Sequence, residues 1–349
     1  MAEATRQPDV ASGAAANVRA QNGHTAVSIG LKALNVGPFL ILVLLVLVIS
    51  LMTPNFLKPG NIGNILAQTA VIAIVAMGQH LVILTRGIDL SVGANLALAT
   101  VVGALVYRWV DSGALVILAM LASGAIVGLV NGAVYVFGRL PHPFIITLAT
   151  LSICKGLALE LAINHTTMRG MPAAVGILGE TSALGAPNSF FIVAGVALIL
   201  LAVAKSMVWG RWTYAVGGSP KAAVEMGIPV KWVLVSVYVI AGLSAGIGGV
   251  VLAGRTGAGS PLYGNLLELD TIAAVIIGGA SFLGGRGHLG HALVGAVMIG
   301  VIRNALNLLN VDVFYQMIAI GLIIVLAVEA DVLRNHLEAR VRISQAKTQ

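Results

Sequence analysis

The amino-acid sequence predicts an all-α, polytopic membrane protein built as a bundle of about ten transmembrane helices. Hydrophobic residues make up 58% of its 349 residues and charged residues only 9%, whereas soluble domains average about 25% charged residues. A straight helix needs about 20 apolar residues to cross a bilayer, so the shorter apolar runs are expected to be tilted or broken. The ten runs lie at 37–53, 64–84, 91–109, 113–136, 143–163, 190–208, 232–253, 268–284, 289–309 and 313–330.

The distribution of positive charge predicts the orientation of these helices. With the amino terminus inside, fourteen of the 20 Lys and Arg residues fall on the inner side, five fall on the outer side, and Lys155 lies within a run. Cytoplasmic loops collect Lys and Arg, so we expect both termini in the cytosol. The chain then divides into a disordered N-terminal tail over 1–36, a transmembrane domain over 37–331 and a C-terminal tail over 332–349.

The second apolar run is interrupted at residues 86–93, whose sequence is Arg-Gly-Ile-Asp-Leu-Ser-Val-Gly. Glycines on both sides of an Asp and a Ser at membrane depth indicate a discontinuous helix, which needs protein or water to satisfy its free backbone groups. Asp89 is equally suited to cap the helix that begins near Ser91. Both interpretations stay open, and they can hold together.

Small and charged residues mark the fourth and fifth runs. Gly124, Gly128 and Gly132 recur every four residues and predict a close helix-packing face. Lys155 and Glu160 are unfavourable in a bilayer unless they are paired or face a cavity. Their spacing places them about 140° apart on a helix, so we expect each to have a partner elsewhere.

The connection 209–231 contains the best candidate for a helix outside the membrane. Gly217 and Gly218 begin a turn in which Ser219 can act as the N-cap and Pro220 as the first helical residue. Gly227 is suited to end the helix, because glycine readily adopts a left-handed conformation.

The predicted helix covers residues 220–226. Ala222, Ala223 and Met226 would form a small apolar face beside Lys221 and Glu225. A helix of about two turns is too short to be stable alone. It therefore needs packing from the membrane domain or from a partner.

Two further connections have distinct compositions. Residues 164–189 are rich in Gly and Pro and are expected to form the longest external loop, with a short helix and a surface for a partner. Residues 285–290 match G-x-G-x-x-G, but no strand precedes them, so a tight turn between helices is favoured over a dinucleotide site.

Glu268 and Asp270 are suited to the amino terminus of the eighth predicted helix, because negative side chains are favourable at the positive end of the helix dipole.

Several signatures of chemistry are missing from the sequence. No Lys follows a Gly, which excludes the G-x-x-x-x-G-K-[ST] phosphate loop. The seven histidines show no H-x-x-x-H spacing, and no serine lies in G-x-S-x-G. Cys154 is the only cysteine, so no disulfide can form within the chain. We expect no enzymatic activity, metal or cofactor.

Five motifs follow one another along the chain. They lie at 86–93, 215–218 with Gly227 and Ile228, 269–279, 284–287, and 304–310 with 315–318. In this order they resemble the ribose-type permeases of bacterial ATP-binding-cassette importers, and the resemblance runs from about residue 38 to residue 331.

This resemblance implies a homodimeric permease of the type II, vitamin B12-importer-like architecture in the bacterial inner membrane. It also implies two partners, a cytosolic ATPase and a periplasmic sugar-binding protein. Coupling to the ATPase would involve Gly217, Gly218, Ser219, Pro220, Lys221, Ala222, Ala223, Glu225 and Gly227. Other importers of this class carry the coupling signature E-A-A-x-x-x-G. Lys221 stands where that signature has its acidic residue, and no Leu-Pro follows at the usual distance.

A sugar path needs groups that exchange hydrogen bonds easily. The candidates for lining it are Gln68, Gln79, Asp89, Ser91, Asn95, Asn131, Asn304 and Asn307. Three alternatives remain open. An ion-coupled secondary transporter would use Asp89, Lys155 and Glu160 as carriers. An ATP-driven permease could carry an amino acid, and a structural membrane scaffold would carry nothing.

Overall fold

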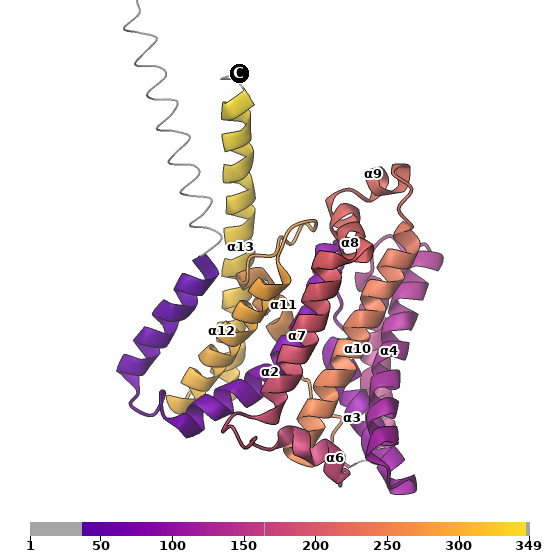
Figure 1. The fold of residues 1–349 in the computed structure, drawn as a ribbon, viewed down its shortest axis with the longest axis vertical. Coiled ribbons are helices and arrows are strands. Elements are labelled where there is room, and N and C mark those ends of the chain that lie inside the picture. The colour runs from indigo at the N-terminus through magenta and orange to yellow at the C-terminus, as the bar shows by residue number, and fades with distance from the viewer. Residues whose placement is uncertain (1–36, 164, 347–349) are drawn as a thin grey trace, which may run out of the picture.

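The computed structural model describes residues 37–163 and 165–346, with side chains described up to residue 333. The predicted tail over 1–36 lies outside the described residues. Within them the chain is almost entirely helical (Figure 1). The helices are Gly37–Met52, α2 (Pro59–Leu84), α3 (Val92–Trp109), α4 (Gly113–Phe137), α5 (Phe144–Leu161), α6 (Ala173–Gly176), α7 (Asn188–Ser206), α8 (Val208–Gly218), α9 (Pro220–Glu225), α10 (Val230–Thr256), α11 (Leu267–Ile277), α12 (Leu289–Leu308) and α13 (Val313–Ala346).

Eight of these helices are long and apolar enough to cross a membrane: α2, α3, α4, α5, α7, α10, α12 and α13. The helix Gly37–Met52 is apolar but shorter. The predicted eighth run, 268–284, is not one helix, because α11 ends at Ile277 and a loop follows. With 11 residues, α11 is about 16 Å long, about half of the 30 Å hydrocarbon thickness. The multi-pass membrane class is confirmed, and the number ten stays a prediction.

The bundle has a buried centre and a lipid-like exterior. Most residues of α2, α3 and α10 are buried, whereas few residues of α4, α5, α7 and α13 are. In Figure 1 the helix Gly37–Met52 lies at one side of the bundle, and it packs through Ile49 against Val301 and Ala305 of α12. The core therefore forms around α2 and α10.

The packing face predicted on α4 is confirmed. A Cβ atom built on Gly124 would lie 2.4 Å from the carbonyl oxygen of Gly242, and one built on Gly128 would lie 2.2 Å from that of Tyr238. Both partners belong to α10. Small residues allow two backbones to come this close, so α4 and α10 pack side by side along most of their length (Figure 1).

Two non-helical segments enter the bundle from opposite ends and meet inside it. Residues 85–91 connect α2 to α3, and residues 260–266 lead into α11. The second segment meets the chain just after the first, where a Cβ on Gly93, in the first turn of α3, would lie 2.3 Å from the Gly264 carbonyl oxygen. The discontinuous helix predicted at 86–93 is confirmed, and a second break was not predicted.

The longest connection lies at the end of the bundle opposite α9. It carries α6, the 3-10 helix η1 (Ile177–Gly179) and the strand β1 (Met168–Arg169). β1 pairs antiparallel with β2 (Ala258–Gly259), with Met168 opposite Gly259. The predicted loop with a short helix is confirmed, and this two-residue pairing is the fold's small departure from all-α.

Candidate functional site

The helix predicted outside the membrane forms α9, at one end of the bundle (Figure 1). Ser219 has an extended backbone, and its hydroxyl oxygen accepts a hydrogen bond from the Ala222 backbone nitrogen at 3.3 Å. Pro220 is the first helical residue. Gly227, with φ of +76°, follows the last turn. The predicted N-cap and stop signal are confirmed.

The packing of α9 involves one residue of the predicted apolar face. Only Ala223 is buried, against Val216 and Val233. Ala222 is exposed, and Met226 is 81% exposed. Of the predicted apolar face, the bundle therefore covers only Ala223, and Ala222 and Met226 stay open to a partner.

The outward side of α9 is a mixed surface, which we call the α9 surface. It consists of Lys221, Ala222, Val224, Glu225 and Met226, and all five residues are exposed. Val224 is 61% exposed. Exposed apolar side chains rimmed by charges are typical of a protein-binding surface.

A second helix outside the spans, α8, was not predicted. Its buried and half-buried side chains Trp209, Trp212, Thr213 and Val216 follow the spacing i, i+3, i+4 and i+7 of an amphipathic helix. The indole nitrogen of Trp209 donates a hydrogen bond to the Ser236 hydroxyl at 2.8 Å. This spacing was the signal that could have identified α8.

Three segments meet beneath α9: the residues after α2, the last residues of α8, and the loop 278–288. We call this meeting point the α9 junction, formed by Arg86, Gly217, Gly218, Gly284 and Gly285. The Arg86 guanidinium donates from Nε to the Gly217 carbonyl at 2.6 Å and from Nη2 to the Gly218 carbonyl. The Gly285 backbone nitrogen donates to the Leu84 carbonyl at 2.8 Å. A cation at the carbonyl end of a helix is electrostatically favourable, so Arg86 fixes the end of α8.

Glycine is required at the centre of the α9 junction. A Cβ atom on Gly217 would lie 1.9 Å from the Leu84 carbonyl oxygen and 2.7 Å from the Gly285 nitrogen. Gly285 has φ of +71° and would place a Cβ 2.7 Å from Gly218 Cα. The predicted tight turn at 285–290 is thus confirmed, and its glycines allow three backbones to touch.

The loop 278–288 is tied to two further helices. Tyr214 of α8 donates its hydroxyl hydrogen to the Gly287 carbonyl at 2.8 Å. Burial raises the pKa of Tyr214, so the phenol keeps the proton that it donates. Asp331 of α13 accepts from the Phe282 backbone nitrogen at 3.1 Å and from the Ser281 hydroxyl at 3.3 Å. The loop 278–288 therefore connects α8 with α13.

Three predicted path residues form one buried cluster. Asp89 Oδ1 accepts from the backbone nitrogen of Ser91 at 2.8 Å and from its hydroxyl at 2.6 Å. Asn131 Nδ2 donates to Ser91 Oγ at 2.9 Å, and its Oδ1 accepts from Thr150 at 2.7 Å. Asp89 thus occupies the predicted helix break, but the prediction that it caps α3 is wrong, because the N-cap residue is Ser91 and Asp89 bonds Ser91 itself and not the first turn of the helix.

The other predicted path residues form other side-chain hydrogen bonds or none, although the backbone nitrogen of Asn95 donates to the carbonyl of Ser91 in the cluster at 2.8 Å. Asn304 exchanges two hydrogen bonds with Asn61, at 2.8 and 2.9 Å, and Asn307 accepts from Gln316 at 2.9 Å. Asn95 donates to the Gly124 carbonyl at 3.1 Å. Gln79 is buried with neither amide atom hydrogen-bonded, and Gln68 is half-buried. The eight residues do not form one continuous lining in this chain, and their role in a path stays a prediction.

The charged residues at membrane depth include an ion pair. Lys155 lies close enough to Glu268 for their opposite charges to interact. Asp270 forms a 2.7 Å ion pair with Arg303. Glu160 is exposed near the end of α5. Glu268 and Asp270 lie in the first turn of α11, as predicted. Among the described residues, no group of three or more His, Cys, Asp or Glu side chains could hold a metal ion.

Residues 61–328 match the family described as "Branched-chain amino acid transport system / permease component". The chain belongs to this permease family. The matched region includes every residue of the α9 surface, the α9 junction and the predicted path, so these features lie within the family's common domain. No solved structure matches the chain.

Individual permeases of the family are similar to this chain over most of its length. The ribose import permease of Bacillus subtilis is 41% identical over 299 residues, which cover 84% of this chain and 92% of the relative. The D-allose transport system permease of Escherichia coli is 38% identical over 297 residues, covering 84% and 90%. The fructose import permease of Rhizobium meliloti is 36% identical over 304 residues, covering 82% and 84%.

Proposed function

We propose that this chain is the permease subunit of a bacterial importer that carries a monosaccharide or polyol into the cytoplasm. This proposal is supported by the sequence identity of 36–41% between this chain and ribose, allose and fructose import permeases, which extends over more than four fifths of each chain. A separate ATPase would supply the energy, and a periplasmic binding protein would deliver the solute.

The α9 surface is the proposed docking site for the ATPase. It is the exposed part of a short helix that stands outside the spans and is held from beneath by the α9 junction. In the proposed orientation α9 faces the bacterial cytosol, and both termini of the chain lie on that same side of the inner membrane. The permease would be a homodimer of type II architecture.

The proposed mechanism is a push on α9 that tilts the helices attached to it. α8 follows α7 after the single residue Met207, and α10 begins at Val230 shortly after α9. At the α9 junction, Arg86 also connects α2 to the helices that would move, and Gly285 connects the loop 278–288 to them. One movement would thus tilt several spans together and change access to a path between two protomers.

A second solute class is supported by the description of the matched family, which names branched-chain amino acids. The relatives that are similar over most of the chain are sugar permeases, so we favour a sugar.

The test is ATP-dependent uptake into proteoliposomes that contain this permease, the ATPase and the binding protein from the same bacterium. We expect uptake of one of ribose, allose, fructose or galactose and none of leucine. Uptake of leucine alone would overturn the sugar assignment. Uptake that persists without ATP and collapses with the proton gradient would overturn the importer class.

A Glu225→Lys variant tests the docking site in the same system. We expect less ATPase bound to the permease and less uptake, because the variant reverses a charge on the α9 surface. Full uptake with an unaltered complex would contradict docking at α9.

A further inference from the structure

Two exposed cations lie at the α9 end of the bundle, where α4 ends and α10 begins. Arg139 follows Gly138, the C-cap residue of α4, and Lys231 is the second residue of α10. The two helices touch at Gly132, where a Cβ atom would lie 2.8 Å from Val235 Cα. Arg139 lies about two turns and Lys231 about one turn beyond this contact, so they stand on neighbouring helix ends (Figure 1). We call these two residues the α4–α10 cation patch.

No described acidic residue pairs with these charges. Both side chains are exposed, and within the described part of the chain neither forms a hydrogen bond or an ion pair. Neighbouring cations repel each other, so an anion between them is electrostatically favourable. A phosphate group suits this position, because it accepts charge-assisted hydrogen bonds from both guanidinium and ammonium groups.

An exposed aromatic pair adjoins the cation patch. The rings of Phe137 and Trp232 meet edge to face, with centroids 5.8 Å apart. The two residues are 53% and 66% exposed, and Trp232 directly follows Lys231. Trp is enriched where a membrane meets water, because one part of its ring system is apolar and another part donates a hydrogen bond. The pair therefore indicates the boundary of the membrane at this edge of the bundle.

The exterior of α4 leads from the membrane to this aromatic pair. α4 is long and apolar enough to span a membrane, and few of its residues are buried. Exposed apolar residues recur along it every three or four positions, at Ile126, Val130, Val134 and Phe137. This spacing places them on one face of the helix. The face suits the acyl chains of lipids, and the headgroups of the same lipids then lie beside the cation patch.

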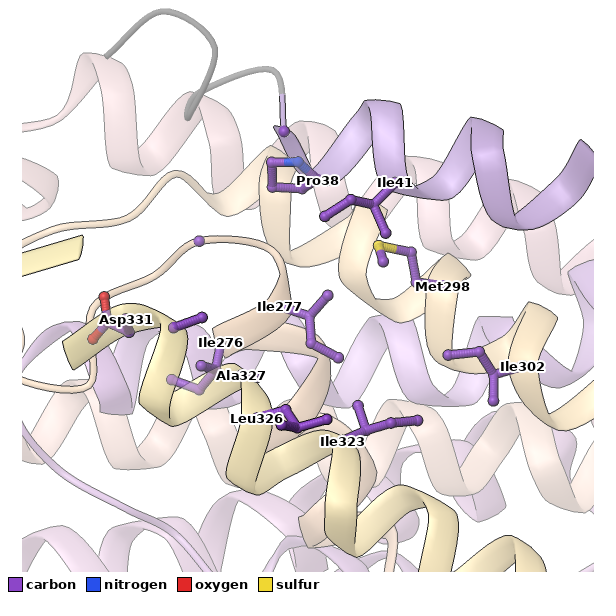
Figure 2. Close-up of a pocket in the computed structure, with 13 residues that line it drawn as sticks. Pro38, Ile41, Ile276, Ile277, Met298, Ile302, Ile323, Leu326, Ala327 and Asp331 are labelled. Atoms are coloured by element: carbon purple, nitrogen blue, oxygen red, sulfur yellow. The ribbon is translucent and has the colours of Figure 1, made fainter. Parts of the chain in front are cut away.

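The far edge of the same end of the bundle has the opposite charge. A crevice opens there between the helix Gly37–Met52 and α13, and Figure 2 shows Asp331 among the residues that line it. Asp331 is the only charged residue among the described residues of that lining. A carboxylate repels a phosphate, so an anionic headgroup is favoured at the cation patch and disfavoured beside α13.

We propose that the α4–α10 cation patch binds the headgroup phosphate of an anionic phospholipid. Arg139 and Lys231 donate hydrogen bonds to the phosphate oxygens, the Phe137–Trp232 pair contacts the glycerol region, and the acyl chains lie along the exposed face of α4. A lipid is favoured over an acidic protein, because the patch continues directly into an apolar face at membrane depth. The bound lipid holds the ends of α4 and α10 together where the chain enters α10 from α9.

Lipid retention tests the role of the two charges. The permease is purified in detergent with equal amounts of phosphatidylglycerol and phosphatidylcholine and examined by native mass spectrometry. We expect Arg139→Gln/Lys231→Gln to retain several-fold less phosphatidylglycerol than the native chain. The control Arg108→Gln/Arg169→Gln removes the same charge from exposed positions at the opposite end of the bundle and is expected to retain the native amount. Equal retention by the two double variants would overturn the proposal.

Fluorescence quenching tests the position of the lipid in the folded native chain. The signal of Trp232 is the difference between the native permease and Trp232→Phe, which keeps an aromatic pair. We expect phosphatidylglycerol brominated close to the glycerol to quench this signal several-fold more than phosphatidylcholine brominated at the same carbons. Equal quenching by the two lipids would overturn the proposal.

Two further outcomes would assign the cation patch to another ligand and so overturn the proposal. The first is displacement of phosphatidylglycerol by an equal concentration of inorganic phosphate, which would show that the site recognises a free anion. The second is an Arg139→Gln/Lys231→Gln variant that no longer co-purifies with the ATPase but retains phosphatidylglycerol in the native amount. That result would identify the patch as a protein-binding surface.

Discussion

At the end of α8, two neighbouring glycines have opposite surroundings, which permits a matched experiment. A Cβ on Gly217 would overlap the Leu84 carbonyl at 1.9 Å, whereas one on Gly218 would meet nothing within 4 Å. We expect Gly217→Ala to destabilise the permease by about 1–3 kcal/mol, the usual cost of overpacking, and to reduce uptake. Gly218→Ala should change neither. Thermal unfolding in detergent and uptake in proteoliposomes measure both effects, and equal behaviour of the two variants would contradict the contact.

Arg86 connects the last two main-chain carbonyls of α8 to the end of α2. Hydrogen bonds to charged groups contribute about 1.5–3 kcal/mol in buried sites, and partial exposure reduces this here. We expect Arg86→Gln to preserve ATP hydrolysis by the complex but to lower the amount of solute carried per ATP, because α9 can then move without α2. Arg211→Gln, at an exposed position of α8, is the control. An unchanged ratio of uptake to hydrolysis in Arg86→Gln would show that this contact does not transmit the movement.

At the scale of the element, the sequence predicted what depends on local chemistry and missed what depends on contacts. Ser219 and Pro220 begin α9 because their own side chains cap and preset the helix. The burial of Ala223 in place of Met226 depends on where Val216 and Val233 lie, which no local pattern reveals.

The two breaks inside the bundle show the same difference. Gly87, Asp89, Ser91 and Gly93 are unusual in an apolar run, so the first break was predicted. The second break follows α10 in a segment that resembles an ordinary external loop. Its depth in the bundle becomes visible only through the contact of Gly264 with Gly93. Likewise, Asn304 and Asn61 are 243 positions apart, so their pairing could not be predicted.

The rotation of α9 predicts different results for two of its apolar residues. Met226 is 81% exposed, so Met226→Glu is expected to leave the melting temperature unchanged. It is expected to weaken ATPase binding by about tenfold, because it would place an unpaired charge in the proposed interface. Ala223 is buried, so Ala223→Leu is expected to lower the melting temperature. Binding is measured by co-purification over a range of ATPase concentrations. Normal binding by Met226→Glu would exclude the α9 surface as the docking site.

At the scale of the whole molecule, the two ends of the bundle have different structures. One end carries α8, α9 and the α9 junction, in which glycines bring three backbones together. The other end carries α6, η1 and the β1–β2 pairing. This asymmetry suits a protein whose partners differ on the two sides of a membrane, and it makes the orientation of the chain the most consequential prediction.

Single cysteines can determine that orientation. The native Cys154 is 2% exposed, so it is expected to be silent toward a membrane-impermeant maleimide. Met226→Cys lies on the α9 surface, and Leu184→Cys, at a residue that is 82% exposed, lies in the connection at the opposite end. Because positive charge favours the cytosolic side, we expect the reagent to label Leu184→Cys in spheroplasts and Met226→Cys only in inverted vesicles. Labelling of Met226→Cys from the periplasmic side would place α9 out of reach of any cytosolic ATPase and would refute the proposed coupling.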